Sequence, residues 1–183
     1  MPAPRHRFTV DDFLRLADAG VLEDEARVEL IDGEIYEMPP IGPDHNGAVI
    51  YFTQTCLARV LSRGLVSIQG PVVLETHTQL QPDVALLRPV DDCYRKRLPR
   101  PQDVLLVIEV AHQSLRYDRA KLPRCAAAGI TEVWLINLAQ DRIEVHQAPA
   151  ETGYRDVRVL GRGESLACLA FPDVVFTVDE ILG

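Results

Sequence analysis

The sequence predicts an α/β fold in which a central mixed β-sheet is flanked by helices, with an N-terminal helix and hairpin before it. Two observations carry this prediction. An uninterrupted apolar run at 104–111 is typical of a strand buried on both faces. A helix, several strands, a second helix and further strands then follow one another along the chain, which favours a mixed sheet. At 183 residues the chain matches one domain, 1–183, with a full core.

The N-terminal segment shows a helix start and a hairpin. Thr9, followed three residues later by Asp12, resembles a capping box and predicts a short helix that ends at Gly20. An Asp-Gly pair inside the alternating stretch 27–38 predicts a two-residue β-turn. Glu29 points to the opposite face from its apolar neighbours, and the residues alone favour an exposed acid on an edge strand.

The middle of the chain contains a second helix and several strand-type segments. We expect a helix capped by Asp44 that begins near His45 and ends at Gly64, where His45 by itself is typical of a capping or surface residue. Stretch 66–74 reads as one broken strand and 80–87 as another. The polar, proline-rich stretch 88–102 is a long connection.

The C-terminal half repeats the alternation of helix and strands. A helix is predicted over 116–128 with Gly129 as its stop, although Pro123 requires either a start near Ala120 or a kink. The strands and the final short helical turn expected after it are 131–137, 142–146, 154–160 and 178–182.

Composition and charge limit the function classes. Apolar residues make up 47% of the chain and charged residues 25%, as in water-soluble globular proteins. The net charge of −8 argues against broad, non-specific adhesion to nucleic acid but allows a local basic rim. The four scattered cysteines indicate free, buried thiols in a reducing cytosol. No signal peptide or membrane-length apolar run is present, so we expect a cytoplasmic protein without membrane contact.

Two acidic residues in strand-type segments suggest a metal site. Glu109 lies within the apolar run, and Asp83 lies near the start of the preceding strand. A buried carboxylate is costly unless a cation pairs with it, and divalent hard cations prefer oxygen ligands. The backbone carbonyl of Val110 could be a third ligand. Lys121, if its helix packs beside this strand, could orient a water or neutralise a phosphate oxygen.

Other interpretations of these residues remain open. Asp83 could cap a strand end, and Glu109 could pair with Arg116 or Arg119 in place of a metal. Lys121 could be a solvated surface lysine that forms a weak ion pair with Asp118, three residues before it.

The order of these motifs resembles the Uma2 family of predicted endonucleases, in the PD-(D/E)xK nuclease superfamily. No single motif is specific, but together they cover nearly the whole chain in the family's order. The matching stretches are 29–34, the loop–helix junction at His45, 81–84, 107–110, and the block from Asp118 through Lys121 to 129–136.

The resemblance implies a restriction-endonuclease-like core with a Mg²⁺-dependent site, at which Mn²⁺ could substitute. Asp83 and Glu109 would be metal ligands, Glu29 a helper acid and Lys121 the catalytic lysine. The superfamily's usual lysine lies two residues after the acid, where this chain has Ala111. His45 and Asp118 are candidate supporting groups beside the ligands. The family's serine after the Glu-Val step and its tyrosine four residues after the lysine are replaced here by the stretch 111–114 and by Cys125.

The sequence is compatible with three functions. The first is a metal-dependent DNA endonuclease, the second is an inactive fold relative that binds DNA or protein, and the third is a hydrolase of smaller phosphoesters. A homodimer would suit cleavage of two strands, as a family-level expectation. Two groups of basic residues are candidate DNA contacts: Arg95, Lys96, Arg97 and Arg100 in the long connection, and Arg116, Arg119 and Arg124 near the helix predicted over 116–128. The alternative for all of them is ordinary solvated surface charge.

Overall fold

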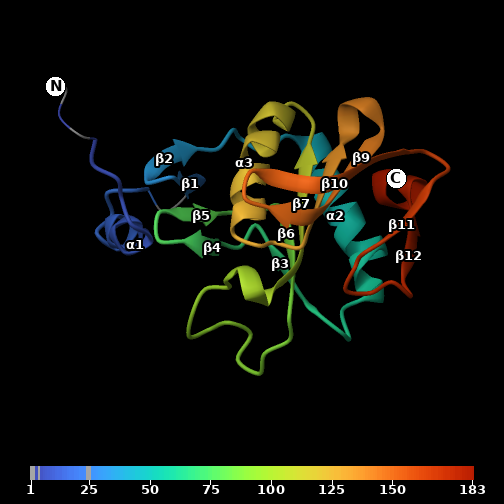
Figure 1. Cartoon of the computed structure of the whole chain (residues 1–183), viewed down its shortest axis with the longest axis horizontal. Helices are drawn as coiled ribbons and strands as arrows, with labels where there is room; N and C mark the ends of the chain where they lie inside the picture. Colours follow the sequence, from blue (N-terminus) through green and yellow to red (C-terminus); the bar gives the residue numbers. More distant parts are fainter. Residues whose placement is uncertain (1–2, 4, 24–25) are drawn as a thin grey trace.

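The computed structural model describes residues 3, 5–23 and 26–183 (Figure 1). The helices are α1 (Val10–Asp18), α2 (Pro43–Thr55), α3 (Leu115–Ala127) and α4 (Val178–Leu182). The strands are β1 (Val28–Ile31), β2 (Glu34–Glu37), β3 (Leu65–Ile68), β4 (Val72–Glu75), β5 (Thr78–Leu80), β6 (Val84–Leu87), β7 (Val104–Ala111), β8 (Glu132–Asn137), β9 (Arg142–Ala150), β10 (Gly153–Gly161), β11 (Ser165–Ala167) and β12 (Val175–Thr177). Three short 3₁₀ turns are η1 (Leu57–Arg59), η2 (Pro101–Asp103) and η3 (Leu138–Gln140).

A six-stranded mixed sheet forms the centre of the molecule, as predicted. Its strand order is β10-β9-β8-β7-β6-β3. Strands β7 and β8 are parallel because α3 connects them, and the other neighbours are antiparallel. The predicted central run becomes β7, whose neighbours are β6 and β8 and whose residues are nearly all buried.

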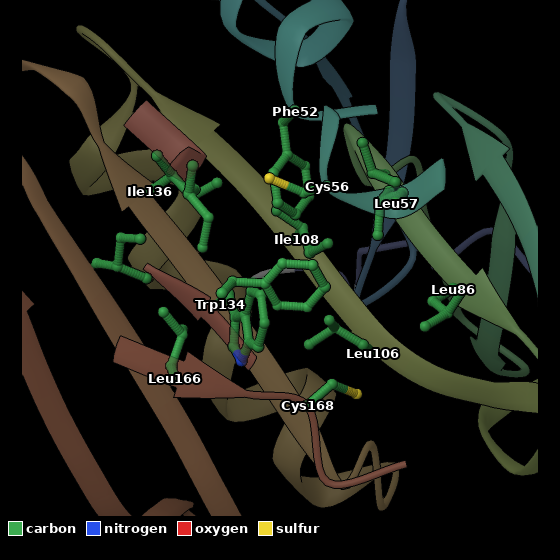
Figure 2. Close-up of a cluster of buried hydrophobic side chains, with 14 of the residues drawn as sticks. Phe52, Cys56, Leu57, Leu86, Leu106, Ile108, Trp134, Ile136, Leu166 and Cys168 are labelled. Carbon is green, nitrogen blue, oxygen red and sulfur yellow. The ribbon is translucent and has the colours of Figure 1, made fainter. Parts of the chain in front are cut away.

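Different elements cover the two faces of this sheet. Successive side chains of β7 point to opposite faces and therefore pack against different elements. Leu106, Ile108 and Val110 pack with α2, α4 and the β11-β12 hairpin in the largest core cluster, around the fully buried Trp134 (Figure 2). Val107 faces α3 on the other side. Glu109, two residues further on, shares that face.

A smaller four-stranded sheet, in the order β2-β1-β5-β4, lies with α1 on one side of the large sheet (Figure 1). The α1 capping box between Thr9 and Asp12 is present as predicted. The predicted hairpin is also confirmed: Asp32 and Gly33 have φ of 53° and 79°, the left-handed values that a two-residue turn of this type requires. A Cβ at Gly33 would lie 2.7 Å from the Arg7 side chain, so only glycine fits.

Three elements predicted in the middle of the chain have wrong boundaries. Helix α2 begins at Pro43 after Gly42, not after Asp44, and ends at Thr55, far before Gly64. The stretch 66–74 is not one strand, because β3 belongs to the large sheet and β4 to the small one. The stretch 80–87 is likewise divided between β5 and β6. Local periodicity does not show that a chain changes sheets.

Helix α3 begins at Leu115 and continues through Pro123, so the predicted start near Ala120 is wrong. The proline removes one hydrogen bond inside the helix, and the buried side chains of α3 hold the helix against the sheet instead. The four cysteines are unpaired as predicted, and three of them are buried, but the expectation of burial is wrong for Cys93, which is exposed. Across the described part of the chain, no helix has the length and apolar character needed to span a bilayer.

Candidate active site

The carboxyl groups of Asp83 and Glu109 lie side by side on one face of the sheet. Strands β6 and β7 are antiparallel, and the pairing of Val84 with Ile108 brings the residue before β6 opposite Glu109. The Asp83 N–H donates to Glu109 Oε2 over 3.2 Å, and the Val110 N–H donates to Asp83 Oδ2 over 2.8 Å. Both acids are buried, and these hydrogen bonds from backbone N–H groups hold their carboxyl groups in place.

Lys121 brings an ammonium group to these acids from α3. Its Nζ lies 2.6 Å from Glu109 Oε1, 3.2 Å from Asp118 Oδ1 and 3.6 Å from Glu29 Oε1. Only 3% of Lys121 is exposed, which contradicts the alternative of a solvated surface lysine. Asp118 pairs with Lys121 as the three-residue spacing predicts, but this pair is buried rather than solvated.

Glu29 reaches the same place from the small sheet. It is fully buried, so the interpretation of an exposed edge-strand acid is wrong. The Gln81 N–H donates to Glu29 Oε1 over 2.7 Å, and the Tyr117 hydroxyl donates to Glu29 Oε2 over 2.5 Å. The acid is buried because α3 covers β1, a contact between segments almost ninety residues apart in sequence.

His45 adds a contact from the first turn of α2. Its Nε2 lies 2.9 Å from Asp83 Oδ1, and its side chain is 16% exposed. His45 therefore touches a candidate ligand instead of capping its own helix. Four secondary elements and the segment before β6 thus supply the groups around Asp83 and Glu109.

A cavity of about 490 Å³ opens onto this cluster. Its lining includes the polar groups of Asp83, Glu109, Asp118, Lys121 and His45, together with Tyr117, Gln81 and His112. The segment 38–43, which contains Met38, Ile41 and three prolines, also lines it. The candidate residues predicted from sequence thus meet beside a cleft large enough for a small ligand.

Electrostatics around the cluster are dominated by burial and by the number of acids. Burial raises the pKa of Glu109 well above its usual value; Lys121 opposes this shift, whereas Asp83, Asp118 and Glu29 add to it. Burial alone would lower the pKa of Lys121, but Glu109, Glu29 and Asp118 outweigh it and raise that pKa. Three carboxyl groups therefore surround one ammonium group in a place with little access to water, and the carboxyl group of Asp83 lies beside them.

The donor set fits a hard divalent cation. Asp83 and Glu109 offer carboxyl oxygens beside the Val110 backbone, and the excess of acids over bases favours an added positive charge. Within residues 3, 5–23 and 26–183, no three His, Cys, Asp or Glu side chains are arranged to share one ion. Two carboxylates are nevertheless typical for Mg²⁺, which keeps several waters and completes its shell with substrate phosphate.

A model of the Uma2 family, described as "Putative restriction endonuclease", matches residues 10–179. The chain belongs to the Uma2 family. A solved structure described as a "putative nuclease belonging to DUF820 from Anabaena variabilis" is similar to this Uma2 chain, with a TM-score of 0.74 and 15% identity. The match covers 96% of this chain and 97% of that one, and it shows a restriction-endonuclease-like fold. The search of curated proteins finds no match.

In this Uma2 protein the residue two positions after Glu109, where the superfamily usually has its lysine, is the uncharged Ala111. Helix α3 supplies the ammonium group to the same acid instead. Cys125, one turn after Lys121, is buried behind the cluster, and burial, with Glu109 nearby, raises the pKa of its thiol to about 12. It therefore contributes a small apolar group rather than a reactive thiol.

The predicted DNA contacts in the long connection lie away from the cavity. Asp83 precedes β6 and Glu109 lies near the end of β7, so the loop with Arg95, Lys96 and Arg97 joins the opposite ends of these strands. The four residues of β6 alone span about 13 Å. Arg97 also donates two hydrogen bonds to Asp103, at 2.5 and 2.9 Å. Contact of this loop with DNA therefore stays a prediction, and any such contact would lie away from the cavity.

The arginines near α3 are also largely engaged elsewhere. Arg119 forms an ion pair with Glu144 of β9, so it does not pair with Glu109 as one alternative required. Arg124 pairs with Asp32 at 2.6 Å. Arg116 is exposed in the first turn of α3 and immediately precedes the cavity residue Tyr117 in sequence. Contact of Arg116 with DNA stays a prediction.

Sequence reasoning missed two groups of the site. Tyr117 lies one helical turn before Lys121, and this four-residue spacing on one helix face could have indicated it. Arg27 lines the cavity and donates to the Pro39 carbonyl over 2.9 Å. No sequence signal identifies Arg27, because its position depends on how the segment after β2 folds back.

Proposed function

We propose that this Uma2 protein is a metal-dependent DNA endonuclease that hydrolyses phosphodiester bonds at the cavity. The observation that carries the proposal is the convergence of Asp83, Glu109 and Lys121 from three elements on one small cleft. The family description and the solved relative, both nucleases by name, support the same reaction class.

Asp83 and Glu109, with the backbone carbonyl of Val110, would hold Mg²⁺, or Mn²⁺ in its place. Such an ion supplies positive charge to the phosphate and makes a water a better nucleophile. Lys121 stands beside the same carboxylates and is placed to donate a hydrogen bond to a phosphate oxygen or to the attacking water.

Glu29 and Asp118 position Lys121 in this proposal. Both oxygens of Glu29 already accept hydrogen bonds, from Gln81 and Tyr117, so Glu29 is better placed to hold the ammonium group than to bind a second ion. His45 in turn restrains the Asp83 carboxyl group through its 2.9 Å contact. Held groups of this kind need little reorganisation during the reaction.

Cleavage and metal titration test the proposal together. Purified protein is incubated with Mn²⁺ or Mg²⁺ and with supercoiled, linear and single-stranded DNA. We expect Asp83→Asn to lower the cleavage rate at least about 100-fold. Glu109→Gln should abolish the calorimetric heat of Mn²⁺ binding. The exposed Asp156, on β10, provides a matched control: Asp156→Asn should leave both unchanged.

Two results would contradict the nuclease proposal: no cleavage of any DNA form, or cleavage that Asp83→Asn leaves intact. Absence of an Mn²⁺ heat would favour the inactive fold relative that binds DNA or protein. A homodimer stays a prediction, and sedimentation equilibrium of the purified chain measures it directly.

A further inference from the structure

The side chains that line the cavity include few cations that are free to contact DNA phosphates. The described residues that line it include the acids Asp44, Asp83, Glu109 and Asp118 and the bases Arg27 and Lys121. Lys121 is held by three carboxylates, and Arg27 donates to a backbone carbonyl. Double-stranded DNA carries one charge per about 1.7 Å, and proteins hold it through rows of Lys and Arg.

Nearby arginines do not supply such a row. Arg119 and Arg124 pair with Glu144 and Asp32, and Arg97 pairs with an acid at the far ends of the strands. Arg116 is exposed in the first turn of α3, and it is not among the described residues that line the cavity. The whole chain carries a net charge of −8, which repels a long polyanion further.

The depth of the acids favours a flexible substrate. Asp83 is 6% exposed and Glu109 4%, so a phosphate must enter the cleft to reach them. A stiff duplex places its phosphates on the outside of a wide rod, whereas an unpaired strand can insert one nucleotide. Enzymes that act inside such pockets use single strands or extruded nucleotides for this reason.

Segment 38–43 forms an apolar and stiff wall of the cavity. Segment 38–43 presents Met38, half-buried Ile41 and the three prolines Pro39, Pro40 and Pro43. Proline fixes the backbone φ, so this wall loses little freedom when a ligand packs on it. The faces of unpaired bases are apolar and are hidden in a duplex. The wall thus matches a surface that only an unpaired strand exposes.

We propose that the cavity takes a nucleotide from an unpaired strand, with its base against the 38–43 wall and its phosphate near Lys121 and the cation that Asp83 and Glu109 would hold. This inference rests on the proposed nuclease function and names its substrate class. The wall offers apolar contact and no base-specific donor, so cleavage should be tolerant of sequence.

The test compares one labelled oligonucleotide in three forms: single-stranded, fully paired, and paired with an unpaired flap. With Mn²⁺ we expect the single strand and the flap to be cut at least about 10-fold faster than the duplex. Ile41→Ser should slow cleavage of the single strand about five-fold and leave the Mn²⁺ heat unchanged. Leu61→Ser, at an exposed apolar side chain outside the cavity, is the matched control and should have no effect.

Equal rates on duplex and single strand would overturn the inference while the nuclease proposal stands. So would an Ile41→Ser variant that matches the Leu61→Ser control. If no form is cut, the nuclease proposal fails, and fluorescence anisotropy with Ca²⁺ then decides the inference by itself. Tighter binding of the single strand, weakened by Ile41→Ser, supports it, and equal binding of both forms refutes it.

Discussion

Lys121→Met removes the one ammonium group from among the buried acids. The chain has two lysines, Lys96 and Lys121, so the exposed Lys96 offers a natural matched control. At an effective dielectric constant of about 20, a pair of charges as close as the 2.6 Å between Lys121 and Glu109 attracts by about 6 kcal/mol. Desolvation of both groups offsets much of this attraction.

Removal of one partner from a buried ion pair usually costs about 3–5 kcal/mol, because the other charge stays buried. Glu109 can take up a proton and thereby relieve part of this cost, since its pKa is already raised by burial. We therefore expect Lys121→Met to lower the free energy of unfolding by about 3 kcal/mol near pH 7.5. For a chain of this length that corresponds to about 6–12 °C in Tm.

Urea unfolding followed by circular dichroism measures the change, with Lys96→Met expected within about 0.5 kcal/mol of the wild type. Mn²⁺ should restore part of the lost stability, because a bound cation replaces the missing positive charge. A loss below about 1 kcal/mol, or a variant that gains stability, would refute the view that Lys121 balances these acids. Identical losses with and without Mn²⁺ would refute the idea that the same acids hold a cation.

Three further predictions concern stability in urea unfolding. Tyr117→Phe should cost about 1–2 kcal/mol, since the buried Glu29 loses a hydroxyl donor while the ring is kept, and an unchanged midpoint would contradict this. Hydrogen bonds from Arg97 hold the pKa of Asp103 below its usual range. Asp103→Asn should therefore cost about 1 kcal/mol at pH 7, and the difference should begin to shrink as pH falls below about 4 and continue to shrink as pH falls through the lowered pKa of the folded protein; a difference that grows as pH falls below about 4 would be evidence against it. Pro123→Ala should stabilise by about 1 kcal/mol or more through a regained helix hydrogen bond, and a loss of stability would show that the proline packs favourably.

Much of the architecture was visible in local patterns. The capping box at Thr9, the Asp-Gly turn and the apolar run of β7 each depend on neighbouring residues, and each is confirmed. The errors in the strands fall where the chain passes from one sheet to the other, between β3 and β4 and between β5 and β6. Both sides of each break are apolar, so the pattern does not reveal to which sheet a strand belongs.

The candidate site shows the same division. Asp83 and Glu109 stood out because an acid in a buried strand is costly, and their antiparallel pairing follows from the adjacent strands. Glu29 was misjudged because alternation on β1 gives its face but not what covers that face. Tyr117 and Arg27 were missed because their importance comes from contacts with distant segments.

The sequence by itself determined the element types, the two acids in buried strands and the family to which the chain belongs, because these depend on residue identity and short-range order. Only the tertiary structure decided that Glu29 is buried, that Lys121 sits among three carboxylates, and that the arginines of the long loop lie far from the cavity. The physical reason is that burial and charge balance depend on which distant surfaces pack together, and packing is a property of the whole chain.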